Sequence, residues 1–255
     1  MQLIYGIHAV DSLLRRNPGS VQRLLVQQGR QDKRIAALLA LAANQGVAVV
    51  RESRQGLDAM VAGRHQGVIA ETSQVSADDG QAESNLWQEA DLLRTVDSKS
   101  GPALILVLDG ITDPHNLGAC LRSADAAGVD AVVVPKDKSA DLNGTCRKVA
   151  CGAAEVVPFV RVTNIVRTLK ALQDRGVWLF GTAGEAEQSL YDSDLTVSMA
   201  LVMGAEGSGL RRLTREQCDY LVRLPMAGSV SSLNVSVAAG IGLFEAVRQR
   251  LDTGR

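Results

Sequence analysis

Three short segments in the C-terminal half of the chain hold most of the residues whose types and spacing can do chemistry. They are Asp113 to Arg122, Gly204 to Gly209 and Pro225 to Asn234, and each combines glycine with amide, hydroxyl or charged side chains. Each follows a short apolar run and precedes a stretch typical of a helix. In open α/β sheets, ligands bind where loops leave the carboxyl ends of the strands. We therefore predict that the three segments together form one ligand site.

The segment from Gly204 to Gly209 carries a single ionisable side chain, Glu206. It is not a Walker-type phosphate loop, because it lacks the Gly-Lys-Ser/Thr sequence. It is not a dinucleotide-binding fingerprint either, since GxGxxG is absent after the first strand and no acidic residue follows at the expected distance. ATP and NAD are thereby disfavoured, and what remains is a loop whose glycines let the backbone approach a ligand closely.

The other two segments each admit a structural and a functional interpretation. Asn116 can cap the helix expected from Leu117, and Arg122 can pair with a neighbouring carboxylate, but both can also contact a substrate. Three serines and Asn234 precede the last helix, where free N–H groups can hold an oxygen-rich group, and an N-cap explains only one of these four residues. Neither a serine nucleophile elbow, nor paired glycosidase-like carboxylates, nor a reactive Cys–His pair is evident. The residues alone predict a small-ligand site without a strong base, and they do not name the reaction.

The composition is that of a globular protein. Of the 255 residues, 46% are hydrophobic and only 3% aromatic, so Ala, Val and Leu can fill a sizeable core in one or two domains. The four cysteines form no CxxC pair and the three histidines lie far apart, so we expect buried thiols and isolated histidines rather than a disulfide framework or a metal site. No apolar stretch approaches the roughly 18 residues of a membrane helix, and the N-terminus lacks the apolar core of a signal peptide. We therefore expect a cytoplasmic protein without a membrane partner.

The net charge of −1 hides an uneven distribution along the chain. Residues 1–71 carry nine Lys and Arg against five Asp and Glu, residues 72–100 carry two against six, and residues 101–255 carry sixteen against seventeen. Only the first segment is basic; such a surface can attract a phosphate backbone, but charge patterning alone favours an ordinary solvated surface. The cations considered for RNA contact are Arg15, Arg16, Arg23, Arg30, Lys33 and Arg34.

The hydrophobic pattern divides the chain into three parts. Residues 1–72 predict a small α/β domain, with helices at 7–14, 33–43 and 55–60 and strands at 23–26, 47–50 and 67–71. Residues 73–100 are polar and acidic, which predicts a linker with at most one helix. Residues 101–255 alternate again, with strands at 103–108, 130–134, 177–180, 199–203 and 220–224 and helices at 117–127 and 235–251. Because these strands are apolar on both faces, they predict a parallel sheet covered by helices on each side.

At the three segments the sequence closely resembles the SpoU family of RNA ribose 2'-O-methyltransferases, within the larger SPOUT group. The matching stretches are Asn116 to Arg122, Gly204 to Gly207, Pro225 to Gly228 and Ser232 to Ala238. Their joint presence, in order and at sensible spacing, is highly specific. The stretches Ile4 to Val10 and His65 to Val68 further look like the bacterial members that methylate a guanosine in the peptidyl-transferase region of 23S rRNA.

The resemblance implies a fold, a cofactor and partners. It implies a C-terminal α/β domain tied in a trefoil knot, an N-terminal L30e-like RNA-binding domain, and a homodimer with sites near the subunit interface. It implies S-adenosylmethionine bound by loops of the knot, with Gly204, Leu224 and Leu233 at matching positions, S-adenosylhomocysteine as product, and no metal. The implied RNA partner is 23S rRNA or a large-subunit assembly precursor. Two alternatives stay open: a non-catalytic RNA-binding or ribosome-assembly factor, and a tRNA ribose 2'-O-methyltransferase.

The resemblance also implies the catalytic positions, which are Arg122, Asn116, Glu206, Ser232 and Asn234. The position of Arg122 is the proposed base in the family, but a guanidinium is a poor base because its pKa exceeds about 12. We expect Arg122 to stabilise the developing alkoxide or a neighbouring phosphate, with Glu206 or Ser232 orienting it. A weak base is tolerable, because base assistance gives about 10²- to 10⁴-fold whereas alignment of two reactants contributes about 7 to 11 kcal/mol.

Overall fold

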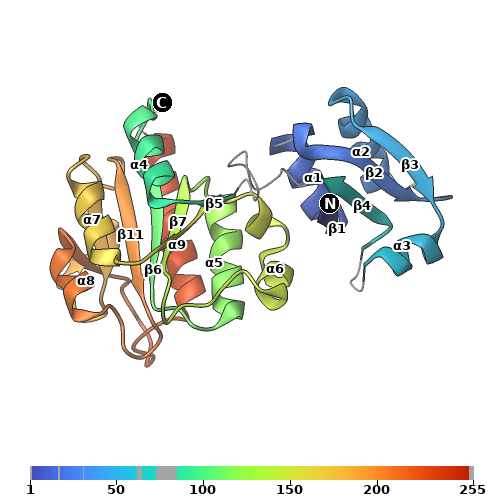
Figure 1. Cartoon of the computed structure of the whole chain (residues 1–255). Helices are drawn as coiled ribbons and strands as arrows, with labels where there is room; N and C mark the ends of the chain where they lie inside the picture. The colour runs from blue at the N-terminus through green and yellow to red at the C-terminus, as the bar shows by residue number, and fades with distance from the viewer. Residues whose placement is uncertain (1, 17, 31, 62–64, 73–84, 253–255) are drawn as a thin grey trace. The chain divides into compact units, whose positions relative to one another are not determined.

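The computed structural model describes residues 2–16, 18–30, 32–61, 65–72 and 85–252. The chain divides into two compact units, Met1–Ser84 and Asn85–Arg255 (Figure 1). Each unit has its own sheet and its own hydrophobic core, so each is described by itself. Within the described residues, no helix is long and apolar enough to cross a membrane.

The first unit is a four-stranded sheet with helices on both faces. Its elements are β1 (Gln2–Tyr5), α1 (Ile7–Arg16), β2 (Val21–Gln27), α2 (Lys33–Asn44), β3 (Ala48–Glu52), α3 (Arg54–Met60) and β4 (Val68–Thr72), and the strand order is β1-β4-β2-β3. β4 is antiparallel to β1 and β2, whereas β2 and β3 are parallel. Val10 of α1 and Leu38 of α2 share one core with Leu24, and Leu57 of α3 packs with Ile69 in the other. The six predicted elements are confirmed, and β1 is an additional strand.

The second unit is built on one parallel sheet. Its strands are β5 (Leu86–Trp87), β6 (Leu104–Asp109), β7 (Ala131–Pro135), β8 (Phe159–Val162), β9 (Trp178–Thr182), β10 (Gln188–Ser189), β11 (Met199–Gly204) and β12 (Tyr220–Arg223). Among the described residues they lie in the order β10-β12-β9-β11-β6-β7-β8-β5, and all neighbouring pairs are parallel. Because parallel strands end at the same edge, the loops that follow β6, β11 and β12 leave the sheet together.

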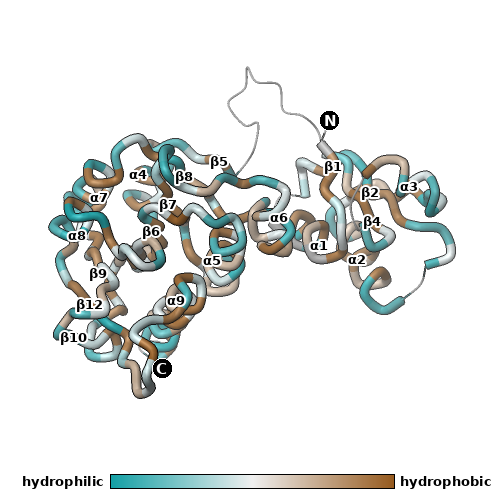
Figure 2. Tube along the Cα trace, turned by 90° about the horizontal axis from the view of Figure 1, so that it is seen from below, coloured by the Kyte–Doolittle hydropathy of each residue, from teal (hydrophilic) through white to brown (hydrophobic). Residues whose placement is uncertain are grey.

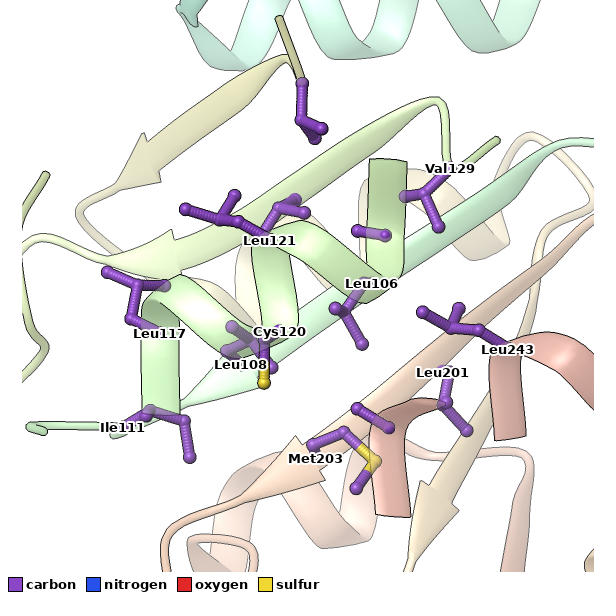
Figure 3. Packing of buried hydrophobic residues seen from close by; sticks show 14 of the residues in the cluster. Leu106, Leu108, Ile111, Leu117, Cys120, Leu121, Val129, Leu201, Met203 and Leu243 are labelled. Carbon is purple, nitrogen blue, oxygen red and sulfur yellow. The ribbon is translucent and has the colours of Figure 1, made fainter. Parts of the chain in front are cut away.

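Helices cover both faces of this sheet. They are α4 (Glu89–Ser98), α5 (Pro114–Ala126), α6 (Gly144–Ala150), α7 (Ile165–Gln173), α8 (Arg212–Gln217) and α9 (Val235–Asp252). Along β6, Leu106 and Leu108 enter a core shared with α5, α6 and α9, whereas Ile105 and Val107 enter a second core shared with α4 and α7. Figure 3 shows the first core, with Leu106, Leu121 of α5 and Leu243 of α9 among its members. This burial on both faces explains the continuous apolar runs, and the predicted parallel α/β sheet with a smaller N-terminal domain is confirmed.

Part of the segment expected to be a linker belongs to the second unit. Residues 73–84 lie outside the described residues, but β5 pairs with β8, and α4 contacts α7. Glu89 accepts a hydrogen bond from Thr168 Oγ1 at 2.7 Å and forms an ion pair with Arg167 at 2.7 Å. The segment predicted as a linker, residues 73–100, therefore overlaps the second unit from Asn85 onward. Composition alone does not separate the two, because acidic side chains that form contacts within a domain look the same in the sequence as those of a linker. The trefoil knot and the L30e-like character of the first unit stay predictions.

Candidate active site

The three segments meet at the carboxyl edge of the second sheet. The first connects β6 to α5, the second follows β11, and the third connects β12 to α9. β6 and β11 are neighbours, with Asp109 opposite Gly204 in register, and β12 is separated from β11 only by β9. The predicted convergence of these segments is therefore a property of the strand order.

The side chains of Asn116, Glu206 and Asn234 form a hydrogen-bonded cluster, one residue from each segment. Asn116 Nδ2 donates to Glu206 Oε1 at 3.1 Å, and Asn234 Nδ2 donates to the same oxygen at 2.6 Å and to Asn116 Oδ1 at 2.8 Å. The backbone N–H of Val235, at the start of α9, lies 3.4 Å from Glu206 Oε1. Glu206 is exposed, so the cluster is open to a ligand. We call Asn116, Glu206 and Asn234 the amide–carboxylate cluster.

Glu206 stands on a tight loop after β11. Ala205 N donates to Gly209 O at 3.1 Å, and Gly209 N donates to Ala205 O at 2.8 Å. Gly207 and Gly209 have φ values of 80° and 65°, in the left-handed region that favours glycine. A Cβ placed on Gly204 would lie 2.0 Å from the carbonyl carbon of Gly209. The glycines are therefore required by the loop that presents Glu206.

Helix termini position the two asparagines. The helix after β6 begins at Pro114, earlier than expected, and its N-cap is Asp113, whose Oδ1 accepts from His115 N at 2.9 Å. The interpretation of Asn116 as the cap of this helix is therefore wrong, and its side chain is available for the cluster. Asn234 does cap a helix, because its Oδ1 accepts from Ser236 N at 2.9 Å while its Nδ2 serves the cluster.

Arg122 and Ser232 are not part of the amide–carboxylate cluster. Arg122 is exposed on α5, and its Nη1 lies 3.7 Å from Cys151 Sγ. Six residues along a helix correspond to about 600° of rotation, so the side chains of Asn116 and Arg122 leave the helix about 120° apart. Ser232 is exposed and makes no hydrogen bond to another described residue. One chain therefore brings together three of the five predicted catalytic residues.

The three residues predicted to bind a cofactor lie at the same edge. Gly204 ends β11, Leu224 follows β12, and Leu233 precedes the last helix, with both leucines half-buried. From Pro225 to Leu233, the backbone groups make no hydrogen bonds to other described residues. Gly184, just beyond β9, adds to this edge, since a Cβ on it would lie 3.8 Å from the carbonyl oxygen of Ser231. Gly184 was not predicted from the sequence, although a glycine shortly after a predicted strand is a signal for a close backbone approach.

Asp109 is a second residue at this edge that was not predicted from the sequence. It ends β6, is 1% exposed, and accepts a hydrogen bond from Arg211 N through Oδ2 at 3.2 Å. Its Oδ1 lies 3.4 Å from Arg211 Nε, an ion-pair contact rather than a hydrogen bond. A buried charge is costly without a partner, so the contact with Asp109 fixes the position of Arg211, which lies directly after the loop that carries Glu206. The signal was an acidic residue at the end of an otherwise apolar strand.

Burial favours the protonated form of three thiols in the second unit. Burial raises the pKa of the Cys120 thiol to about 12, and the nearby Cys146 and Glu206 add to the effect. Burial also raises the pKa of Cys146 to about 11 and that of Cys218 to about 12. Cys151 differs, because it is exposed, contrary to the expectation of buried thiols. Among the described residues, no group of three or more His, Cys, Asp or Glu side chains is placed to hold a metal ion.

Comparison with known proteins gives matches to both units. The SpoU rRNA Methylase family matches residues 103–244, and a domain described as RNA 2'-O ribose methyltransferase substrate binding matches residues 3–77. The 23S rRNA (guanosine-2'-O-)-methyltransferase RlmB of Pseudomonas syringae pv. tomato is 59% identical over 98% of this chain and 96% of that protein.

Two crystal structures extend the comparison. The SpoU methyltransferase AviRb from Streptomyces viridochromogenes, in complex with the cofactor AdoMet, is 27% identical with a TM-score of 0.69, over 98% of this chain and 90% of that one. The A. aeolicus TrmH/SpoU tRNA modifying enzyme is 34% identical with a TM-score of 0.56, over 64% of this chain and 83% of that one.

Proposed function

Because the chain belongs to the SpoU rRNA methylase family, we propose that it is an S-adenosylmethionine-dependent enzyme that methylates the ribose 2'-hydroxyl of a guanosine in 23S rRNA. The observation that carries this proposal is the amide–carboxylate cluster, which joins the three family motifs at one edge of the sheet. The similarity to the curated rRNA enzyme over both units supports the same RNA and the same nucleoside. The substrate is the peptidyl-transferase region, in free 23S rRNA or in a large-subunit precursor, and both occur in the bacterial cytoplasm.

The edge formed by β9, β11 and β12 fits S-adenosylmethionine. The unpaired backbone groups of residues 225–233 are available to the polar atoms of a ligand, and half-buried Leu224 and Leu233 offer it apolar contact. The close approach at Gly204 leaves no space for a side chain and keeps the loop backbone tight against the end of β11. When bound, the cofactor supplies a methyl group on a positively charged sulfur, so that the transfer needs no metal ion.

The cluster is suited to positioning the attacking hydroxyl. The contacts of Glu206 all use Oε1, which leaves Oε2 able to accept a hydrogen bond from the ribose 2'-hydroxyl. Asn116, Asn234 and the N-terminus of α9 fix the carboxylate through charge-assisted hydrogen bonds. Ser232 places a further hydroxyl in the same segment. Arg122 stabilises the negative charge that develops on the ribose oxygen as its proton leaves.

We infer that Arg122 of the partner subunit of a homodimer completes each site. Within one chain Arg122 points away from the cluster toward Cys151. α9, which packs against α5, carries Val237, Phe244 and Leu251 at seven-residue spacing, with exposed fractions of 50%, 49% and 67%. Seven residues are close to two helical turns, so these side chains form one apolar stripe, and hydrophobic segments can be followed along α9 in Figure 2. Such a stripe is typical of a subunit interface.

The two alternatives are less well supported. A non-catalytic RNA-binding factor has no need of a cluster that joins all three motifs. A tRNA ribose methyltransferase uses the same chemistry, but the tRNA-modifying relative covers 64% of this chain, whereas the rRNA enzyme matches 98% of it.

Ribose methylation mapped over total RNA, in cells with and without this protein, tests the proposal. We expect the loss of methylation at one guanosine of 23S rRNA, and its return when the purified protein and S-adenosylmethionine are added to the RNA. Loss at a tRNA position instead favours the tRNA enzyme. A folded protein that binds no S-adenosylmethionine in calorimetry, even with RNA present, favours the non-catalytic factor.

A further inference from the structure

We propose that a basic groove on the first unit binds two or more consecutive phosphate groups of the RNA backbone. This groove has a volume of about 480 Å³ and is lined by Ile7, Arg30, Asp32, Lys33, Arg34 and Gln66. We call it the basic groove. The inference deepens the proposed function, on which it rests, because it assigns the substrate contact to one face of the first unit.

The charge of the groove is positive and its one carboxylate is already engaged. Three cations, Arg30, Lys33 and Arg34, line it against the single Asp32. Asp32 Oδ1 caps α2 by accepting from Arg34 N and Ile35 N, both at 3.1 Å, and its Oδ2 accepts from Arg30 Nε at 2.6 Å. Asp32 is therefore part of the scaffold, and Lys33 and Arg34 remain to meet an anion.

The wall of the groove is fixed by contacts between distant parts of the chain. Arg30 donates to the carbonyl oxygen of Gln66, and Gln66 Oε1 in turn accepts from the backbone N–H of Ile7 at 3.1 Å. Gln66 has a φ of 50°, in the left-handed region, and Gly67 follows with a φ of 71°. A Cβ on Gly67 would lie 2.7 Å from Arg30 Nη1, so the glycine makes room for the guanidinium. A preorganised wall loses little entropy when a ligand binds.

Three other cations of the first unit, Arg15, Arg23 and Arg54, are paired with carboxylates, whereas Arg51 donates to the carbonyl oxygens of Gln27 and Arg30. Arg23 pairs with Glu71, which is only 2% exposed, and Arg15 forms an ion pair with Asp11 at 2.8 Å. The side chain of Arg16 lies outside the described residues. Lys33 and Arg34 are exposed and form no ion pair with another described residue. Because each unpaired cation that meets a phosphate releases a counterion, Lys33 and Arg34 are the contributors expected within the basic groove.

The test compares two double variants that remove equal charge from the full-length protein. Lys33→Ala with Arg34→Ala empties the groove of its free cations, and Arg15→Ala with Arg54→Ala removes two cations paired with Asp11 and Asp58 outside it. Binding of a transcript of the 23S peptidyl-transferase region is measured by fluorescence anisotropy at several salt concentrations. An unrelated RNA of equal length is measured in parallel.

The groove variant should weaken binding of both RNAs, since phosphate contacts carry no sequence information. Each contact accounts for a slope of about 0.7 to 0.9 in log affinity against log salt, so the slope should fall by about 1.4 to 1.8 and affinity by roughly 25- to 60-fold at 0.1 M salt. The KM for RNA should rise, whereas kcat and the affinity for S-adenosylmethionine should stay unchanged. The charge-conserving pair Lys33→Arg and Arg34→Lys should restore binding, and the control variant should stay near wild type.

Equal slopes and equal KM values for the groove and control variants would overturn the assignment while leaving the proposed methyl transfer intact. The wild-type protein could also bind RNA with the expected salt slope but transfer no methyl group, while the groove variant loses that slope. This result would reject the proposed function and support the basic groove as a phosphate site. Loss of binding to the 23S transcript alone would mean that the groove reads bases rather than phosphates, and would also overturn the inference.

Discussion

The exchange Glu206→Gln tests the role of the carboxylate with the smallest change in shape. A glutamine can keep its carbonyl oxygen at the position of Oε1, so Asn116 Nδ2, Asn234 Nδ2 and Val235 N retain an acceptor. The charge is lost, and an NH₂ group takes the place of Oε2. An NH₂ group cannot accept a hydrogen bond from the ribose hydroxyl, so the variant separates the scaffold role from the positioning role.

The expected effect on stability is small. Hydrogen bonds to charged groups contribute about 1.5 to 3 kcal/mol and neutral ones about 0.5 to 1.5, and loss of the favourable charge at the start of α9 costs about 0.3 to 1 kcal/mol. Because Glu206 is exposed and screened by water, we expect a loss of about 1 kcal/mol in the free energy of unfolding, a shift of about 2 to 4 °C in melting temperature. The rate should fall much more, by about 10²- to 10⁴-fold in kcat, if the carboxylate holds or receives the hydroxyl proton.

The assay is single-turnover methyl transfer at saturating RNA and S-adenosylmethionine, together with cofactor calorimetry and thermal unfolding. Cofactor affinity should change little. Glu216→Gln is the matched control, because Glu216 is an exposed carboxylate whose ion pair, with Arg212 at 2.7 Å, lies within α8. A Glu206→Gln variant that keeps kcat within about threefold of wild type would refute the positioning role and reduce the carboxylate to a brace between the three loops.

Four further expectations follow from the same geometry. Arg122→Ala should abolish methyl transfer and keep cofactor affinity, and an equal mixture with Asn234→Ala should regain about a quarter of wild-type activity, because half of the randomly formed dimers then carry one intact site; no recovery would mean that each chain holds a complete site. Gly204→Ala should lower the melting temperature and cofactor affinity together, since its Cβ would lie 2.0 Å from backbone and overpacking costs about 1 to 3 kcal/mol; wild-type values of both would contradict the loop geometry. Phe244→Asp should yield monomers in analytical ultracentrifugation, and an unchanged dimer would exclude the α9 stripe as the interface. Iodoacetamide at pH 8 should modify Cys151 well before Cys120, because Cys151 is exposed whereas burial raises the pKa of Cys120 to about 12; equal labelling rates in peptide mapping would argue against that burial. For the same reason, the free energy of unfolding should fall as the pH rises above about 9, since the Cys120 thiol ionises in the unfolded chain before it ionises in the folded one.

Local patterns of apolar and polar residues in the sequence predict much of the fold. The strand predicted at 103–108 was recognisable because the residues from Leu104 to Leu108 are buried on both faces and all apolar, and the six elements of the first unit followed from alternation alone. The strand Phe159–Val162 and the helix Ile165–Gln173 were not predicted, because a four-residue strand gives a weak signal. The first strand, Gln2–Tyr5, is stabilised by pairing with β4, which lies far along the chain.

Residue types and their spacing along the chain are enough to recognise the three motifs, their order, and the amide and carboxylate side chains that we propose for the site. The partners that those side chains contact depend on the fold. Asn116 contacts Glu206, 90 residues away, and Asn234, 118 residues away, instead of capping its own helix, and Arg122 leaves the same helix in another direction. Likewise, Arg23 is neutralised by Glu71 whereas Lys33 and Arg34 stay free. The physical reason is that residue type and spacing fix local backbone preference, whereas the partner of a polar side chain is set by which strands become neighbours in the sheet.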